Sequence, residues 1–360
     1  MNNNILKNEE KAVLALRSLY RGYGYLPYRM SKFEEYELYI RNKDFLVGDR
    51  MITFNSTGGK LMALKPDVTF SIIKSGEDIP GFKQKVYYNE NVYRVSDSTH
   101  DFKEIMQAGL ECIGDVDLYD IYEVTDLAAR SLATISDDFV LELSHLGIIS
   151  DTLEKICPDK GFAEKALGFI AEKNTHDLAK LCEEYGVDPE KAAMVEVFVT
   201  AYGERKAVIS KLKETTGGIP EEIETLSELL DGSEYGDRIR FDFSVVNNMS
   251  YYNGFVFRGF VSGIPGGVLA GGQYDKMMAR MGRRSGAVGF AIYLDMLEEL
   301  VRNEPDHDVD VLLVYDGGTD KARVAAAVSE VIASGKTVSA QKTVPEKLRY
   351  REMIDLRRDD

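Results

Sequence analysis

The amino-acid sequence predicts an α+β protein built on one large, mostly antiparallel β-sheet flanked by helices, with a helical insertion and a short C-terminal α/β piece. Three observations support this prediction. Strand-like segments alternate with turn residues over about residues 51–115, a helical run covers about residues 149–230, and strand-like segments return from residue 238. Strands on both sides of a helical run, joined by hairpin-like connections, are typical of an α+β domain.

The first half of the chain supplies helices and strand pairs in turn. Residues 7–20 carry apolar side chains at helical spacing, and residues 51–66 alternate around a Ser-Thr-Gly-Gly turn, a pattern that predicts a β-hairpin. Two further strands, joined by a polar loop, are predicted over residues 85–95 and 105–114. After them we expect a helix over residues 117–133 and a strand over residues 138–147.

The second half begins with the helical run, which is rich in Ala, Leu, Glu and Lys. The sheet is then expected to resume with strands over residues 238–246, 251–261 and 286–292, and a helix over residues 293–302 ends it. Residues 309–316 form a predicted buried strand, followed by a helix over residues 321–334 and a strand over residues 336–342. We therefore predict a core domain of residues 1–303, with its insertion at about 150–232, and a truncated segment of residues 309–360.

Composition limits the classes of function. The chain has 360 residues, of which 44% are hydrophobic and 29% charged, as in a globular protein with a core. The formal net charge is −16, and tight nucleic-acid binding rests on cationic contacts to phosphates, so we expect no nucleic-acid partner. The cysteines Cys112, Cys157 and Cys182 lie far apart without a paired motif, and we expect no metal site, no cofactor and no disulfide.

No segment of the sequence predicts a membrane protein. The N-terminal residues read as an amphipathic helix without the apolar core of a signal peptide. No stretch approaches the roughly 18 uninterrupted apolar residues that a membrane span needs. We expect a soluble, cytoplasmic protein.

Polar residues stand out at the ends of predicted strands. The segment LKPDVT, residues 64–69, places Asp67 and Thr69 two positions apart, where both can face one pocket, or where Asp67 caps a helix that Thr69 begins. Arg94 ends a strand and suits a carboxylate or phosphate, although for this residue alone a surface ion pair is the favoured interpretation.

The following strand and two later segments add further candidates. Gln107 and Glu111 lie on one face of their strand, where they either form a core hydrogen-bond network or meet a ligand. Tandem tyrosines, Tyr251 and Tyr252, precede a glycine, and Tyr274 follows a Gly-rich stretch. That stretch lacks the spacing of a dinucleotide or phosphate-binding loop.

Taken in order, LKPDVT, the Arg-ended strand, QAGLECIG, YYNGFVF, GGQYD and GAVGFAIYLDML resemble the catalytic core of histidyl-tRNA synthetase, a class II aminoacyl-tRNA synthetase, over residues 8–302. The resemblance implies a dimeric protein with an antiparallel sheet of six to seven strands and a histidine pocket on that sheet. The histidine-binding positions fall on Asp67, Thr69, Arg94, Gln107, Glu111, Tyr251, Tyr252 and Tyr274. Asp67 is one methylene shorter than the glutamate of the family.

The sequence departs from the family at the positions that bind ATP. Ser96 stands where the family has a Glu that touches adenine, and Lys103 replaces a second Arg. Asn247 and Met296 replace arginines that bind the reacting carboxylate and the phosphates. Adenylate formation needs cations aimed at the phosphorus, and loss of one such group typically costs about 10²–10³-fold in rate. We therefore expect aminoacylation to be lost and predict no catalytic residue.

Synthetase-like proteins without aminoacylation include the regulatory subunit of the short-form ATP phosphoribosyltransferase of histidine biosynthesis. This resemblance implies a non-catalytic subunit that activates a separate catalytic subunit and mediates feedback by histidine, as a homodimer within a hetero-oligomer. A free-standing amino-acid-binding paralogue and an active histidyl-tRNA synthetase remain as alternatives.

Overall fold

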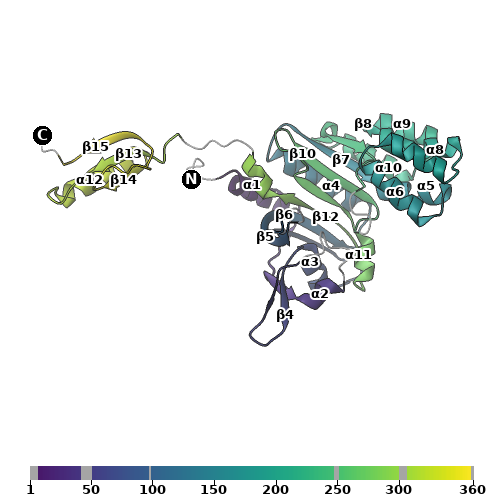
Figure 1. The fold of residues 1–360 in the computed structure, drawn as a ribbon, viewed down its shortest axis with the longest axis horizontal. Coiled ribbons are helices and arrows are strands. Elements are labelled where there is room, and N and C mark those ends of the chain that lie inside the picture. Colours follow the sequence, from purple (N-terminus) through teal and green to yellow (C-terminus); the bar gives the residue numbers. More distant parts are fainter. Residues whose placement is uncertain (1–6, 42–50, 97–98, 247–250, 300–305, 358–360) are drawn as a thin grey trace. The chain divides into compact units, whose positions relative to one another are not determined.

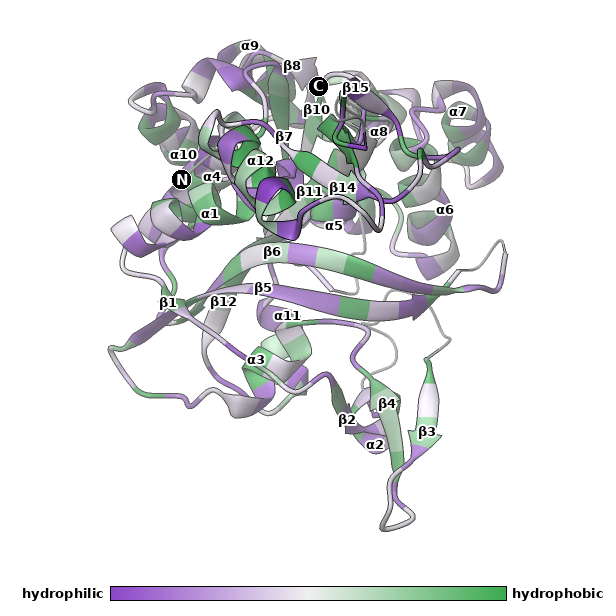
Figure 2. Cartoon of the chain, turned by 90° about the vertical axis from the view of Figure 1, so that its left-hand side faces the viewer, coloured by the Kyte–Doolittle hydropathy of each residue, from purple (hydrophilic) through white to green (hydrophobic). Residues whose placement is uncertain are grey.

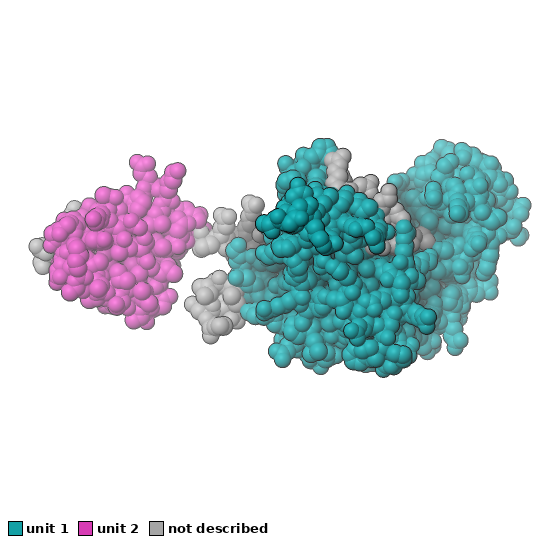
Figure 3. All heavy atoms as spheres, turned by 90° about the horizontal axis from the view of Figure 1, so that it is seen from below, with its two compact units in different colours: residues 1–300 teal, residues 301–360 magenta. Residues whose placement is uncertain are grey.

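The computed structural model describes residues 7–41, 51–96, 99–246, 251–299 and 306–357. The chain forms two compact units, residues 1–300 and residues 301–360 (Figure 3). No helix among the described residues is long and apolar enough to cross a membrane.

The first unit is built on a nine-stranded sheet with the order β1-β5-β6-β12-β11-β10-β7-β9-β8. Neighbouring strands are antiparallel, except for the parallel pairs β1–β5 and β7–β9. The strands are β1 (Leu26–Pro27), β5 (Lys83–Val95), β6 (Phe102–Gly114), β7 (Phe139–His145), β8 (Tyr202–Gly203), β9 (Ile239–Asp242), β10 (Phe255–Val261), β11 (Leu269–Gln273) and β12 (Gly286–Tyr293).

The mostly antiparallel sheet confirms the predicted fold class, with more strands than the six to seven that the resemblance implied. The two-residue strands β1 and β8 lie at its edges, and β11 lies within the Gly-rich stretch. The strands β5 and β6 run side by side over their whole length, and both hydrophilic and hydrophobic residues occur along them (Figure 2). One face of these strands contributes Tyr87, Ala108 and Leu110 to the main hydrophobic core. The opposite face combines the polar residues Arg94, Gln107 and Glu111 with the apolar residues Val86 and Val92 of a second hydrophobic cluster.

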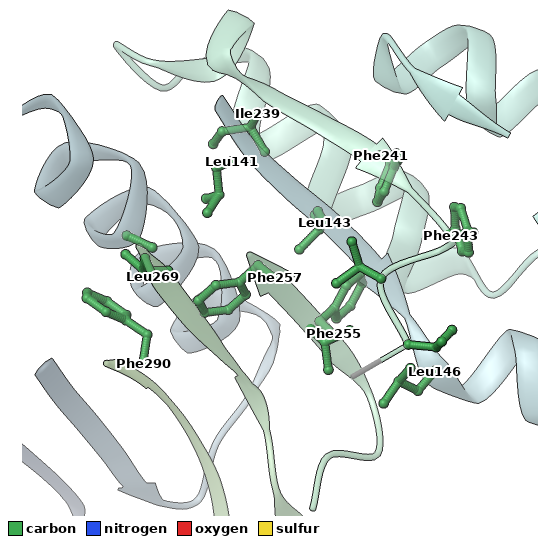
Figure 4. Close-up of a cluster of buried hydrophobic side chains, with 14 of the residues drawn as sticks. Leu141, Leu143, Leu146, Ile239, Phe241, Phe243, Phe255, Phe257, Leu269 and Phe290 are labelled. Carbon is green, nitrogen blue, oxygen red and sulfur yellow. The ribbon is translucent and has the colours of Figure 1, made fainter. Parts of the chain in front are cut away.

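Helices α1 (Asn8–Gly22) and α4 (Leu118–Ala133) cover that core face. Leu16 and Tyr20 of α1 and Leu127 of α4 are buried with Phe290 of β12 in one hydrophobic cluster, and the Tyr20 hydroxyl lies 3.0 Å from Ser131 Oγ. The cluster continues across β7, β9, β10 and β11, whose inward side chains interlock (Figure 4). Removal of this apolar surface from water is the main stabilising contribution to the unit.

The predicted helical insertion is present between β7 and β9. Its helices are α5 (Leu146–Ile156), α6 (Lys160–Ala171), α7 (Thr175–Glu184), α8 (Pro189–Thr200), α9 (Arg205–Thr216) and α10 (Glu221–Asp231). The buried Arg205 ties this insertion to the sheet, because its guanidinium donates to the Ile239 carbonyl at 2.9 Å and to Asp231 at 2.6 Å. A 3₁₀ turn, η3 (Gly236–Arg238), leads back into β9.

The first unit also contains a second, small sheet, in which the strands have the order β2-β4-β3. It comprises β2 (Phe33–Glu35), β3 (Thr53–Asn55) and β4 (Leu61–Leu64), of which β3 and β4 form the predicted hairpin. Helix α2 (Tyr36–Ile40) contacts β2 and β4 of this sheet, and α3 (Thr69–Ser75) follows β4 in the chain. Helix α11 (Asp275–Arg280) follows β11. The segment LKPDVT thus joins β4 to α3, so that the predicted strand end and the predicted helix start are both present.

The helix predicted over residues 293–302 is only partly observed. Tyr293 belongs to β12, and a 3₁₀ helix, η4 (Leu294–Glu299), follows it, while the remaining positions lie outside the described residues. Tyr293 pairs with Gln107 in the sheet ladder, and this pairing keeps it extended rather than helical.

The second unit contains β13 (Val309–Val314), α12 (Lys321–Ala333), β14 (Val338–Gln341) and β15 (Tyr350–Asp355). Its strands form a parallel sheet with the order β14-β13-β15. The first three elements match the predicted strand, helix and strand. We did not predict β15, because its charged residues hide the apolar alternation that marks a strand.

Candidate functional site

A cavity of about 300 Å³ lies on the sheet face opposite α1 and α4. This volume is at the lower end of the range of about 300–1,000 Å³ for small-molecule sites. All eight residues that the sequence analysis assigned to a histidine pocket by resemblance line this cavity. They come from α3 and the residues just before it, from β5 and β6, from the residues before β10, and from the residue before α11. The lining residues are Asp67, Val68, Thr69, Tyr88, Arg94, Gln107, Glu111, Tyr251, Tyr252, Ala270, Tyr274, Gly289, Phe290, Ala291 and Tyr293.

Small residues at matched positions on adjacent strands form the floor of the cavity. Gly289 is the ladder partner of Glu111, and Ala291 pairs with Gly109 on one side and with Ala270 on the other. A Cβ atom at Gly289 would lie 1.8 Å from Glu111 Oε2, and one at Gly109 would lie 2.1 Å from the Phe290 carbonyl oxygen. The glycines therefore leave the room that the cavity and the Glu111 side chain occupy.

Glu111 lines the cavity, is 2% exposed, and accepts two side-chain hydrogen bonds. The Thr69 hydroxyl donates to Oε1 at 2.8 Å, and the Tyr274 hydroxyl donates to Oε2 at 2.6 Å. Burial raises the pKa of the Glu111 carboxyl to about 8, against the lowering effect of these two hydrogen bonds. A carboxyl fixed in this manner can exchange a proton near neutral pH and can hydrogen-bond an imidazole ring.

Asp67 and Arg94 supply the charged pair of the cavity. Asp67 accepts a hydrogen bond from the Phe70 amide at 3.1 Å, and Arg94 Nε donates to the Pro66 carbonyl at 3.1 Å. Burial raises the pKa of Asp67, and the nearby Arg94 guanidinium opposes that shift. A negative and a positive group beside each other suit the ammonium and the carboxylate of a zwitterionic amino acid.

A buried ion pair supports the segment that carries Asp67. The Lys65 ammonium is fully buried and donates to Glu90 at 2.6 Å, and the Lys65 carbonyl accepts from the Tyr93 amide at 2.9 Å. Glu90 pairs in register with Gln107. These contacts fix the approach to α3 against β5, and neither Lys65 nor Glu90 was selected from the sequence.

The remaining polar side chains line the open space. Gln107 is 4% exposed, and its side-chain amide has no hydrogen-bond partner within the described ranges, so this amide is available to a ligand. Tyr88 and Tyr293 also line the cavity and were missed in the sequence. Strand alternation was the signal that could have found Tyr88, because it shares the face of Arg94, six positions later on β5.

Of the positions that depart from the family, Ser96, Lys103 and Met296 lie within the described residues. Ser96 is buried just beyond β5, and Met296 packs at the edge of the hydrophobic core, with its Cε 3.7 Å from the place of a Cβ atom at Gly266. Lys103 is exposed on β6, and Asn247 lies outside the described residues. In the part of the chain that the structure describes, no group of three or more His, Cys, Asp or Glu side chains is placed to hold a metal ion.

The family model for histidyl-tRNA synthetase matches residues 3–297 of the chain. The ATP phosphoribosyltransferase regulatory subunit of Oceanobacillus iheyensis is 27% identical over 287 residues, which cover 78% of this chain and 70% of that protein. The histidine–tRNA ligase of Methanosarcina acetivorans is 27% identical over 321 residues, covering 87% of this chain and 76% of that protein.

Solved structures share the fold. The ATP phosphoribosyltransferase regulatory subunit/histidyl-tRNA synthetase from Bacillus halodurans has a TM-score of 0.78 at 20% identity, covering 98% of this chain and 95% of that chain. A chain of the ATP phosphoribosyl transferase complex from Thermotoga maritima has a TM-score of 0.62 at 22% identity, covering 79% of this chain and 97% of that chain. Both likenesses extend over most of the chain.

Proposed function

The chain belongs to the histidyl-tRNA synthetase family, and on this premise we propose that it is a non-catalytic regulatory subunit of a short-form ATP phosphoribosyltransferase. It activates a separate catalytic subunit and makes the complex sensitive to histidine. Its likeness to a regulatory subunit from Oceanobacillus iheyensis and to a chain of the Thermotoga maritima complex supports this proposal.

The observation that carries the proposal is the contrast between the two parts of the synthetase-like site. The cavity retains an acid, a guanidinium and a buried amide in Asp67, Arg94 and Gln107. At the positions where the resemblance places arginines for the reacting carboxylate and the phosphates, the sequence has the neutral residues Asn247 and Met296 instead. Since phosphoryl chemistry depends on preorganised positive charge, this pattern favours ligand binding over adenylate formation.

L-histidine is the ligand that we assign to the cavity. Its ammonium pairs with Asp67, its carboxylate with Arg94, and its imidazole reaches Glu111 and Tyr274. The Gln107 amide completes the polar contacts, and the small residues of the floor provide the room. Each ionic group of the amino acid thus meets a group of opposite charge or a hydrogen-bond partner.

Regulation requires that histidine binds one state of the complex better than another. A tenfold preference corresponds to about 1.4 kcal/mol of coupling, which one charge-assisted hydrogen bond can provide. We propose that the chain acts as a homodimer within a hetero-oligomer with the catalytic subunit. The net charge of −16 supports a protein partner rather than transfer RNA.

The test combines the purified chain with the short-form catalytic subunit of the same organism and measures phosphoribosyl-ATP formation with and without L-histidine. We expect the chain to stimulate the catalytic subunit and histidine to inhibit the complex. Gln107→Met keeps the volume of this buried side chain but removes its amide, so it should retain stimulation and need about tenfold more histidine. The exposed Gln341→Met in the second unit is the matched control and should behave as the wild type. Failure to stimulate, or failure to form a stable complex, refutes the proposal.

An active histidyl-tRNA synthetase is the second candidate. The sequence identity of the chain to the Methanosarcina acetivorans ligase is 27%, the same as its identity to the Oceanobacillus iheyensis regulatory subunit. Histidine-dependent ATP–pyrophosphate exchange by the purified chain distinguishes the two. We expect no exchange above background, and exchange at the rate of a synthetase would establish the enzyme instead. A free-standing amino-acid-binding paralogue would bind histidine without any effect on the catalytic subunit.

A further inference from the structure

Tyr293 is the last residue of β12, and its side chain ends the row of small residues on the cavity face. Gly289, Ala291 and Tyr293 follow each other at every second position, and all three line the cavity. The first two leave the floor open, whereas Tyr293 is the first large side chain on this face of β12. The Tyr293 phenol ring therefore bounds the cavity where β12 ends and η4 begins.

The phenol of Tyr293 has no hydrogen-bond partner among the residues that the structure describes, and the side chain is only partly exposed. Arg94 and Asp67 are both close enough to influence its titration, and burial raises its pKa above the ordinary value. The group accordingly stays protonated at neutral pH, as a hydrogen-bond donor in the same cavity as Asp67 and Arg94.

The opposite end of the cavity suits the side chain of the ligand. Glu111 is held there by Thr69 and Tyr274, and it pairs in register with Gly289. Tyr293 lies four residues after Gly289, about 13 Å along the strand at roughly 3.3 Å per residue. The Tyr293 side chain and one extended amino acid fill this span when the ligand's side chain faces Glu111 and its carboxylate faces Tyr293 and Arg94.

We propose that Tyr293 is a ligand-binding and size-determining residue, which donates its phenol hydrogen to the carboxylate of a bound α-amino acid beside Arg94 and closes the cavity to larger ligands with its ring. This inference rests on the proposed amino-acid site but not on stimulation of the catalytic subunit. A carboxylate extended into an ester or an adenylate meets the Tyr293 ring, so the same residue restricts the site to free amino acids.

The experiment measures binding to the full-length chain by isothermal titration calorimetry with two probes, L-histidine and histamine, which lacks the carboxylate. Tyr293→Phe keeps the ring and removes only the hydroxyl. We expect it to weaken L-histidine binding about tenfold or more and to change histamine binding by less than about twofold. Tyr119→Phe, at an exposed tyrosine of α4, is the matched control and should leave both affinities unchanged.

The size-determining role is tested with Tyr293→Ala and a non-hydrolysable histidyl-adenylate analogue. We expect the analogue to bind this variant at least tenfold more tightly than the wild type, after circular dichroism has shown that the variant folds. The inference is overturned if Tyr293→Phe weakens both probes equally or neither, or if the wild type binds the analogue as tightly as Tyr293→Ala does. Absence of L-histidine binding to the wild type also overturns it, whereas the stimulation assay decides the regulatory function separately.

Discussion

Replacement of Glu111 by glutamine should change how the stability of the first unit depends on pH. Glu111 is 2% exposed, and burial raises its pKa from 4.5 to about 8. The folded state therefore keeps this proton over a pH range in which the unfolded state has released it. The stabilisation is fully present below about pH 4.5 and is lost as the pH rises through about 8. Glutamine carries no titrating proton, so the variant lacks this contribution at every pH.

The magnitude follows from the shift in pKa. At about 1.4 kcal/mol per pKa unit, the shift corresponds to up to about 5 kcal/mol in the free energy of unfolding. The difference between wild type and Glu111→Gln should fall by this order between pH 4.5 and pH 9. Urea unfolding at a series of pH values, followed by circular dichroism, measures it directly. Glu104→Gln, at an exposed position of the same strand, is the control. Parallel pH profiles for wild type and Glu111→Gln would refute the reasoning.

Other parts of the structure yield three further predictions. Gly289→Ala places a Cβ atom 1.8 Å from a Glu111 carboxylate oxygen. We expect this variant to lose about 1–3 kcal/mol of unfolding free energy, measured by urea unfolding, and to lose L-histidine binding, measured by calorimetry. Arg205→Met removes the hydrogen bonds that Arg205 donates to the Gly236 carbonyl of η3 and the Ile239 carbonyl of β9, and it should cost about 3–5 kcal/mol. Lys206→Met at the exposed neighbouring position should cost less than about 1 kcal/mol in the same unfolding experiment. Removal of residues 301–360 should leave the calorimetric affinity for L-histidine unchanged, because every lining residue of the cavity belongs to the first unit.

Periodicity predicted most helices and long strands of the fold correctly, because amphipathic segments repeat their apolar residues at the spacing of the element they form. It failed where the residue pattern was weak. β11 consists of LAGGQ and forms only because β10 and β12 pair with it on both sides. Tyr293 follows an apolar strand and precedes an amphipathic stretch, and the ladder bond to β6 decided that it is part of the sheet.

The candidate site followed from the order of short motifs, and the cavity includes all eight residues that these motifs indicated. The motifs did not indicate the long-range side-chain contacts that hold the residues of the site in place. The Lys65–Glu90 pair joins residues 25 positions apart, and the Tyr274 hydrogen bond to Glu111 joins residues 163 positions apart. Neither pair has a local pattern, because the contact exists only once the sheet has brought the strands together.

By itself, therefore, the sequence determined the α+β class, the helical insertion and the identity of the polar groups that could meet an amino acid, since strand alternation and residue chemistry are local properties. The tertiary structure alone decided that these groups share one cavity, that glycines on adjacent strands leave room for it, and that Glu111 is buried deeply enough to hold its proton near neutral pH. Volume, burial and long-range hydrogen bonds depend on which strands become neighbours, and that is a property of the whole folded chain.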